Sequence, residues 1–146
     1  MTPDDRARRS AQSMWADDRA SQALGMELLD VTPGRAALRM TVREDMVNGH
    51  AIGHGGFTFT LADSAFAFAC NSYNRRTVAA ACEIRFLAPT RLGDVLHAEA
   101  VERERAGRDG TYDITVRCEN RVVAQFTGQS KEIRGTLFDE DQEEGD

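Results

Sequence analysis

The chain has 146 residues, of which 41% are hydrophobic and 29% are charged. It is long enough for one globular domain, and its composition excludes collagen-like, disordered and membrane-spanning classes. Lys and Arg number 18 and Asp and Glu number 24, but all six excess acids lie after residue 138. The rest of the chain is therefore balanced and offers no basic field to nucleic acid or to an anionic membrane. The start has no apolar signal sequence, so we expect a cytoplasmic protein.

Two segments flank the expected core of the domain. Residues 4–22 are polar, with Met14 and Trp15 as their only large apolar side chains, and they predict a short amphipathic N-terminal helix. Residues 139–146 contain the six excess acids and predict a solvated, disordered tail. Residues 1–138 are then expected to form a single domain.

The elements between these segments predict an α+β fold. Residues 57–72 contain neither Gly nor Pro and are too long for an ordinary strand, so they predict a helix. Six other segments have the length or the alternation of strands and are separated by turn residues: 26–31, 36–42, 77–87, 94–105, 111–118 and 121–131. The order lacks βαβ alternation, which favours one antiparallel sheet packed against one long helix.

The long predicted helix carries a single charged residue. Between Asp45 and Arg75 lie 29 residues, and only Asp63 among them is charged. Burying a lone carboxylate costs several kcal/mol unless it is paired or protonated, and inside a helix the backbone N–H groups are already taken. Asp63 is therefore a candidate catalytic carboxylate. A carboxylate satisfied by an arginine or by a helix N-terminus is the structural alternative.

The helix has two different faces. An apolar stripe suited to packing on the sheet consists of Phe57, Leu61, Ala65 and Phe68. The other face is small and partly polar, and it suits contact with a ligand or with a second copy of the helix. It consists of Gly56, Thr60, Asp63, Ala67 and Asn71.

Two glycines precede this helix. At a helix start, the N–H groups of Gly55 and Gly56 lack intrahelical partners, and no side chain obstructs a ligand. Such donors stabilise a developing oxyanion, and loss of one typically costs ~10²–10³ in rate. A tight turn that leads into a helix is the alternative interpretation.

The spacing of Gly55 and Asp63 predicts a shared site. Eight residues on one helix correspond to ~12 Å, whereas a carboxylate and an oxyanion donor that serve one carbonyl group span only ~7 Å. Two helices that run antiparallel across a two-fold axis would bring the aspartate of one towards the glycines of the other. We therefore expect an obligate dimer.

Other chemistries are less well supported. A metal site formed by His50, His54 and Asp63 is disfavoured because glycines interrupt any helix through the histidine pair and the HExxH glutamate is absent. Ser64 lies in no GxSxG elbow, which disfavours a serine nucleophile. No CxxC pair occurs, and three free thiols are expected in the core: Cys70, Cys82 and Cys118.

A family resemblance rests on several short segments. Residues 48–56 read NGHAIGHGG and residues 60–67 read TLADSAFA, which resembles the hotdog-fold acyl-CoA thioesterases and, within them, the phenylacetic-acid-degradation (PaaI) group. The resemblance continues through FLAP at 86–89 and GTYDI at 110–114, and it covers roughly residues 22–136. It implies a hotdog fold, in which an antiparallel sheet wraps around one long central helix.

The resemblance also implies roles for individual residues. Asp63 matches the catalytic carboxylate, which acts as a nucleophile or as a base for water. Gly55 matches the N–H group that polarises the thioester carbonyl, while Asn48 and His54 match positions that orient substrate or water. The family builds its site across a homodimer, often within a dimer of dimers. It uses no metal and no cofactor apart from the coenzyme A of its substrate.

Further candidates concern substrate binding. The helix offers three residues for contact with the substrate: Gly56, Thr60 and Ser64. On charge grounds only, the candidates for the coenzyme A phosphates are Arg91, Arg108 and Lys131.

We therefore expect an acyl-CoA thioesterase that converts (hydroxy)phenylacetyl-CoA-like or other aryl or medium acyl-CoA thioesters to the free acid and coenzyme A. One alternative is a hotdog hydratase or dehydratase that uses His54 with Asp63, although the GHFP-like element expected for it is absent. The other is a non-catalytic acyl-CoA-binding protein of the same fold, which would have no need of a buried acid.

Overall fold

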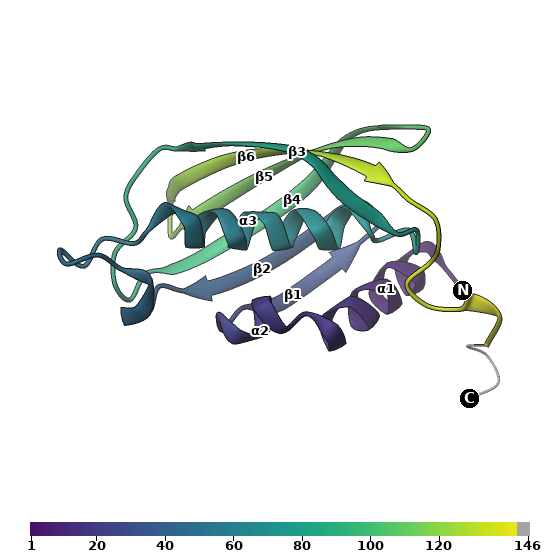
Figure 1. Ribbon diagram of the computed structural model, residues 1–146, viewed down its shortest axis with the longest axis horizontal. Coiled ribbons are helices and arrows are strands. Elements are labelled where there is room, and N and C mark those ends of the chain that lie inside the picture. The colour runs from purple at the N-terminus through teal and green to yellow at the C-terminus, as the bar shows by residue number, and fades with distance from the viewer. Residues whose placement is uncertain (143–146) are drawn as a thin grey trace.

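The computed structural model describes residues 1–142. Its six strands form one antiparallel sheet in the order β1-β2-β4-β5-β6-β3, which curves around helix α3 (Figure 1). The strands are β1 (Glu27–Thr32), β2 (Arg35–Thr41), β3 (Thr77–Phe86), β4 (Val95–Ala106), β5 (Asp109–Cys118) and β6 (Arg121–Glu132). The predicted α+β arrangement is confirmed, with element ends shifted by a few residues.

Helix α3 (Gly55–Cys70) lies in the concave side of the sheet and contacts β2, β4 and β5. Leu61, Ala65 and Phe68 are buried, as their helical spacing predicts, while Phe57 at the helix start is only half-buried. The ring of Phe68 lies 6.1 Å from that of Trp15 in the N-terminal segment. Because the sheet covers one side of the helix, Thr60, Asp63 and Ala67 on the opposite side are only half-buried.

The predicted outward face ends before Asn71, which is buried. Its side-chain amide donates to the Thr77 carbonyl at 3.0 Å, and its side-chain oxygen accepts the Thr77 N–H at 2.9 Å. Asn71 therefore joins the end of α3 to the start of β3, instead of facing outward with Thr60 and Asp63.

The glycine at position 128 of β6 allows the helix to approach the sheet closely. A Cβ atom at Gly128 would lie 2.7 Å from atoms of the Phe66 ring, which is 1% exposed. The same ring packs against Tyr112 and Phe126, with ring centroids 5.7 Å and 5.9 Å away. Gly128 is therefore required for the aromatic packing that seats α3.

The predicted N-terminal helix is divided into α1 (Pro3–Asp17) and α2 (Arg19–Ala23), which lie beside β1 (Figure 1). A capping box between Thr2 and Asp5 starts α1. The break falls at Asp18, whose backbone leaves the helical region with φ −85° and ψ 80° and whose side chain accepts the Ser21 N–H. Asp18 therefore ends one helix and caps the next.

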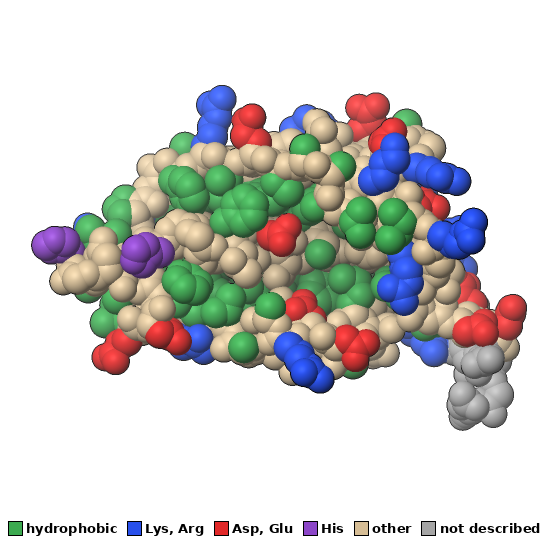
Figure 2. Space-filling view, viewed as in Figure 1, with side chains coloured by type: hydrophobic (Ala, Val, Ile, Leu, Met, Phe, Trp, Pro, Cys, Tyr) green, Lys and Arg blue, Asp and Glu red, His purple; other side chains and the backbone are tan. Residues whose placement is uncertain are grey.

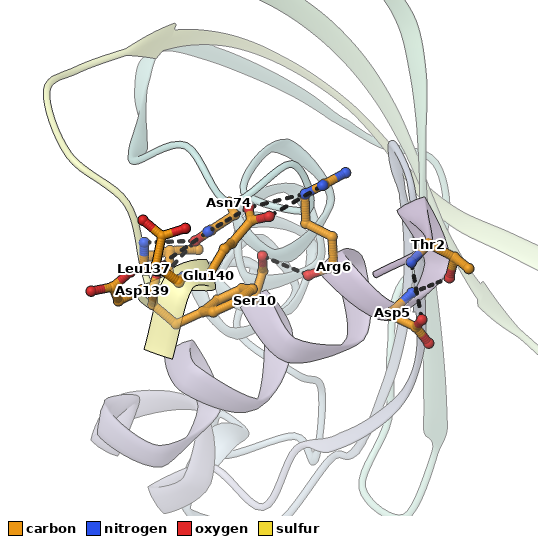
Figure 3. Close-up of polar contacts among 10 residues, drawn as sticks. Thr2, Asp5, Arg6, Ser10, Asn74, Leu137, Asp139 and Glu140 are labelled. Atoms are coloured by element: carbon orange, nitrogen blue, oxygen red, sulfur yellow. Dashed lines mark hydrogen bonds and ion pairs between the residues drawn. The ribbon is translucent and has the colours of Figure 1, made fainter. Parts of the chain in front are cut away.

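The chain beyond β6 returns to α1, and its described part ends in the 3₁₀ turn η2 (Glu140–Gln142). The side chains of Arg6, Asn74 and Glu140 point toward one another (Figure 3). Arg6 donates to the Glu140 carboxylate from Nε at 3.0 Å, and Asn74 donates to it at 3.0 Å. The structure thus differs from the tail expected from residue 139, because these contacts hold Glu140 in place. Residues 143–146 of that tail lie outside the described residues, and the domain boundary at residue 138 stays a prediction.

Candidate active site

The first feature of the site is the start of α3. Gly55 is its first residue, and the N-cap residue His54 is exposed and makes no side-chain capping hydrogen bond. The first N–H groups of a helix lack intrahelical acceptors and lie at the positive end of its dipole. This helix start is therefore available as a donor site for an anionic or strongly polarised oxygen.

Asn48 organises the loop that leads to this helix start. Its side-chain oxygen accepts the N–H groups of His50 at 2.9 Å and of Ile52 at 3.1 Å. The loop also contains Ala51 with a left-handed φ of 61°, and it returns through a hydrogen bond from the His54 N–H to the Met46 carbonyl. The Asn48 side chain thus stabilises its own loop, and this loop holds His54 at the start of α3.

The second feature is Asp63, which lies half-buried on the outward side of α3. Among residues 1–142, its carboxylate has no hydrogen bond and no ion pair with an arginine, lysine or histidine. Burial, and secondly the negative charge of Asp18, raises the pKa of Asp63. The structural alternative of a carboxylate satisfied by an arginine or a helix N-terminus is therefore not met within the described chain.

A largely apolar cavity of about 460 Å³ borders the helix start. Its lining comes from the end of β3 and the following loop, from α3 and the loop before it, and from β6: Gly53, Gly55, Thr58, Phe86, Leu87, Ala88, Pro89, Thr90 and Val123. Asp63 is not part of this lining, because it follows Gly55 by eight residues, or ~12 Å along the helix. Within one chain, the candidate acid therefore lies far from the candidate oxyanion donor.

The face that carries α3 has few charges at its centre. Figure 2, which has the viewpoint of Figure 1, shows hydrophobic side chains on both sides of α3 and most basic side chains at the rim. The neighbouring edge strand β3 is paired with β6 on one side only. Val78, Phe86 and Leu87 are exposed in or just after this strand, at 45%, 55% and 57%. A long apolar edge of this kind is a template for pairing with another strand.

The three cysteines do not share one environment. Cys70 and Cys118 are buried, as predicted, but Cys82 is exposed on β3. The prediction is wrong for Cys82 because its strand lies at the sheet edge, a property that local sequence does not encode.

The residues predicted to contact substrate on α3 differ in their surroundings. A Cβ atom at Gly56 would have no neighbour within 4 Å, so the space beside it is open. The Thr60 hydroxyl donates to the Gly56 carbonyl at 2.8 Å. Ser64 is buried, and its hydroxyl is 2.8 Å from that of Ser21 in α2. Thr60 and Gly56 thus border the open side of the helix, whereas Ser64 faces the N-terminal helices.

The three basic residues predicted for the coenzyme A phosphates are not brought together within one chain. The backbone of Arg91 forms an isolated β-bridge with that of Ile52, next to the start of α3. Arg108 and Lys131 lie by the opposite end of the helix, where Lys131 forms an ion pair of 3.4 Å with Asp109.

The predictions from sequence missed two parts of the site. The first is the contribution of Phe86 and Leu87 to the cavity. The second is the hydrogen-bonded link from Asp18 through Ser21 to Ser64. The only local signal for this link is the N-cap preference of Asp before a helix. In the described part of the chain, no three His, Cys, Asp or Glu side chains cluster as a metal site, and no helix is long and apolar enough to span a bilayer.

Comparisons with known proteins identify relatives along most of the chain. Residues 50–125 match the family described as the thioesterase superfamily. The acyl-coenzyme A thioesterase PaaI of Escherichia coli (strain K12) is 43% identical over 136 residues, which cover 92% of this chain and 97% of that protein. The solved structure of the E. coli PaaI protein aligns with a TM-score of 0.90 over 92% of this chain and 99% of that chain, at 41% identity. A variant of the phenylacetic acid degradation protein PaaI from Thermus thermophilus aligns with a TM-score of 0.77 at 38% identity, over 80% of this chain and 100% of that chain.

Proposed function

The chain belongs to the thioesterase superfamily as a PaaI-type acyl-CoA thioesterase, and we propose that it hydrolyses aryl or arylacetyl thioesters of coenzyme A, with Asp63 and Gly55 as the reacting pair. The observation that carries the proposal is Asp63 itself. It is half-buried and unpaired among the described residues, on the same helix whose start has no side-chain cap and borders an apolar cavity.

We place each site between two protomers. The exposed β3 edges would pair antiparallel, and their helices would then run antiparallel across the two-fold axis. Asp63 of one protomer would approach Gly55 of the partner subunit, which removes the ~12 Å separation along a single helix. The exposed apolar side chains of β3 support this arrangement, since a second strand would cover them.

The reaction follows from the two groups. The thioester oxygen accepts the N–H of Gly55 of the partner subunit, which stabilises the negative charge of the tetrahedral intermediate. Asp63 accepts a proton from a water molecule whose oxygen attacks the carbonyl carbon. When the intermediate collapses, the C–S bond breaks and Asp63 returns the proton to the sulfur, so that the acid and free coenzyme A leave.

The raised pKa of Asp63 favours this base role over direct attack, because a proton acceptor works best when its pKa approaches the working pH. Single turnover in heavy-oxygen water tests the choice. Direct attack would form an anhydride, and its hydrolysis would place label in Asp63 on the first turnover. A base role places label in the released acid only.

The preference for an aryl group rests on the cavity. Its walls include Phe86, Leu87 and Val123, and its volume of about 460 Å³ suits a ring or a medium acyl chain. The T. thermophilus relative is a phenylacetic acid degradation protein, which agrees with this class. A cytoplasmic location, assembly into a dimer of dimers and the absence of a resident metal or cofactor stay predictions.

Thiol release from phenylacetyl-CoA tests the proposal with Asp63→Asn, and with Asp30→Asn as the matched control at an exposed acid. We expect the wild type and the control to release thiol and Asp63→Asn to lose ~10²–10⁴ of the rate. Equal rates for all three would remove Asp63 from the mechanism. No thiol release by the wild type across a broad acyl panel would favour a binding protein. Loss of the crotonyl-CoA enoyl absorbance without thiol release would favour a hydratase.

A further inference from the structure

Helix α2 is joined to α3 by a short hydrogen-bonded chain next to Asp63. The Asp18 carboxylate accepts the Ser21 N–H at 3.0 Å and the Ser21 hydroxyl at 2.7 Å. The Ser21 hydroxyl is in turn 2.8 Å from the Ser64 hydroxyl. Ser21 and Ser64 are 2% and 8% exposed, so their hydroxyl groups are shielded from water, while Asp18 is half-buried. One buried hydroxyl group thus separates the Asp18 carboxylate from the residue that follows Asp63.

The surroundings of Asp63 contain no compensating positive charge in the described chain. The titratable groups that interact with it are Asp18 at the start of α2, Cys70 on its own helix and Cys82 on β3. Burial, with a smaller contribution from the Asp63 charge, raises the pKa of both thiols, so they add no negative charge at neutral pH. Asp18 is therefore the charged neighbour that acts on Asp63, and burial strengthens interaction between charges.

We propose that Asp18 is a positioning residue for the hydrolytic reaction: fixed by Ser21 and Ser64, its negative charge favours proton transfer to Asp63. The inference rests on the proposed role of Asp63 as base. A second carboxylate disfavours the ionised form of the first, which makes that carboxylate a better proton acceptor. Asp18 lies outside the residues matched to the family, 50–125, so an N-terminal segment adjusts chemistry performed within the matched core.

The substitution Asp18→Asn isolates the charge. Asn is as good an N-cap as Asp, so the hydrogen bond from the Ser21 N–H is retained and α2 keeps its start. We expect the acidic limb of the pH profile of kcat/KM to move to lower pH, because the pKa of Asp63 falls when the repelling charge is removed. The maximal rate should fall as well, since Asp63 becomes a weaker base.

Two further variants separate charge from structure. Asp17→Asn removes an exposed charge one residue away and should leave the limb where it is. Asp18→Glu keeps the charge but alters the N-cap of α2, and it should show the acidic limb of the wild-type kcat/KM profile. Thermal unfolding of each variant shows whether it is folded. A purely structural role for Asp18 would change the unfolding temperature and leave the limb unmoved.

The outcome for Asp63→Asn keeps this inference separate from the proposed function. Suppose that Asp63→Asn is inactive and that the acidic limb of the kcat/KM profile is the same in Asp18→Asn as in the wild type. The role of Asp18 is then overturned, while the role of Asp63 stands. If Asp63→Asn remains active, the proposed function itself fails. A limb that moves equally in Asp17→Asn and Asp18→Asn would also overturn the inference, because it would then reflect net charge alone.

Discussion

The ring of Phe86, at the end of β3, lies against the backbone of Gly55 at the first residue of α3. A Cβ atom at Gly55 would be 2.8 Å from Cζ of that ring and 2.9 Å from its Cε1. Both residues line the same apolar cavity. The edge strand and the helix start therefore form one wall, and a side chain at Gly55 would require the Phe86 ring to shift.

This contact predicts the effect of Gly55→Ala. The N–H donor remains, but the added methyl group displaces the Phe86 ring and shifts the donor from its place, so we expect kcat/KM to fall on the order of 10–100-fold. Gly49→Ala in the same loop is the matched control, because a Cβ atom there has no neighbour within 4 Å. Steady-state kinetics with phenylacetyl-CoA compares the two. A Gly55→Ala enzyme as active as the control would show that the Phe86 ring can move aside without any loss of kcat/KM.

Asp63 is expected to reduce stability at neutral pH while it supports catalysis. Its pKa is higher in the folded state than in the unfolded chain, so the folded state binds the extra proton between these two values. Stability is therefore lost as pH rises through this range and stays low above it. Asp63→Asn should raise the unfolding temperature at pH 7, and the gain should vanish below the unfolded value of ~3.9.

Thermal unfolding of Asp63→Asn and of the control Asp30→Asn across pH checks this effect. The exposed Asp30 should give no comparable gain at pH 7. A lower unfolding temperature for Asp63→Asn at pH 7 would mean that a favourable partner stabilises its carboxylate in the assembled protein.

The β3 edge predicts which surface would hold the proposed dimer together. Val78→Lys places a charge on this edge and should convert the proposed dimer to a monomer that lacks thioesterase activity. Leu29→Lys on the opposite edge strand β1 is the matched control, because both side chains are 45% exposed. Light scattering coupled to gel filtration gives the mass of each. A dimeric and active Val78→Lys protein would place the interface elsewhere.

A shared site also predicts complementation between two damaged chains. In a mixed dimer of Asp63→Asn and Gly55→Ala protomers, one of the two sites combines an intact Asp63 with an intact Gly55. Unfolding and refolding an equimolar mixture should therefore give a higher activity than the average of the two parent proteins, in both of which every site is damaged. If each site lay within one chain, mixing would recover none.

Asn74 is expected to matter more for stability than the ion pair beside it. Its side chain is 2% exposed and accepts the N–H groups of Leu137 and Phe138 at 2.9 Å and 3.1 Å. Asn74→Ala leaves these donors unpaired and places Ala at a left-handed φ of 58°, so we expect a loss of ~2–4 kcal/mol in unfolding free energy. Denaturant titration gives the value.

The partly exposed pair of Arg6 and Glu140 provides the comparison. Glu140→Gln should cost less than ~1 kcal/mol, as is usual for surface ion pairs. Equal losses in Asn74→Ala and Glu140→Gln would indicate that the C-terminal segment is held mainly by charge.

The local pattern of the sequence was sufficient for the central helix and for the direction in which Asp63 points. Spacing along a helix decides which side chains share a face, so Leu61, Ala65 and Phe68 were correctly assigned to a buried face. The six strands were likewise found from alternation and turn residues. The site hypotheses for Asp63 and Gly55 came from the same local features, namely a depletion of charge and a glycine pair at a helix start.

Tertiary structure decided what lies beside these residues. The exposure of Cys82, the burial of Asn71 and the contact of Phe86 with Gly55 depend on β3 being an edge strand that follows α3 in the chain and pairs with the distant β6. The hydrogen-bonded link from Asp18 through Ser21 to Ser64 depends on how α2 packs on α3. Such relations join residues far apart in the chain, and local periodicity carries no information about them, because it records only which face of its own element a side chain occupies.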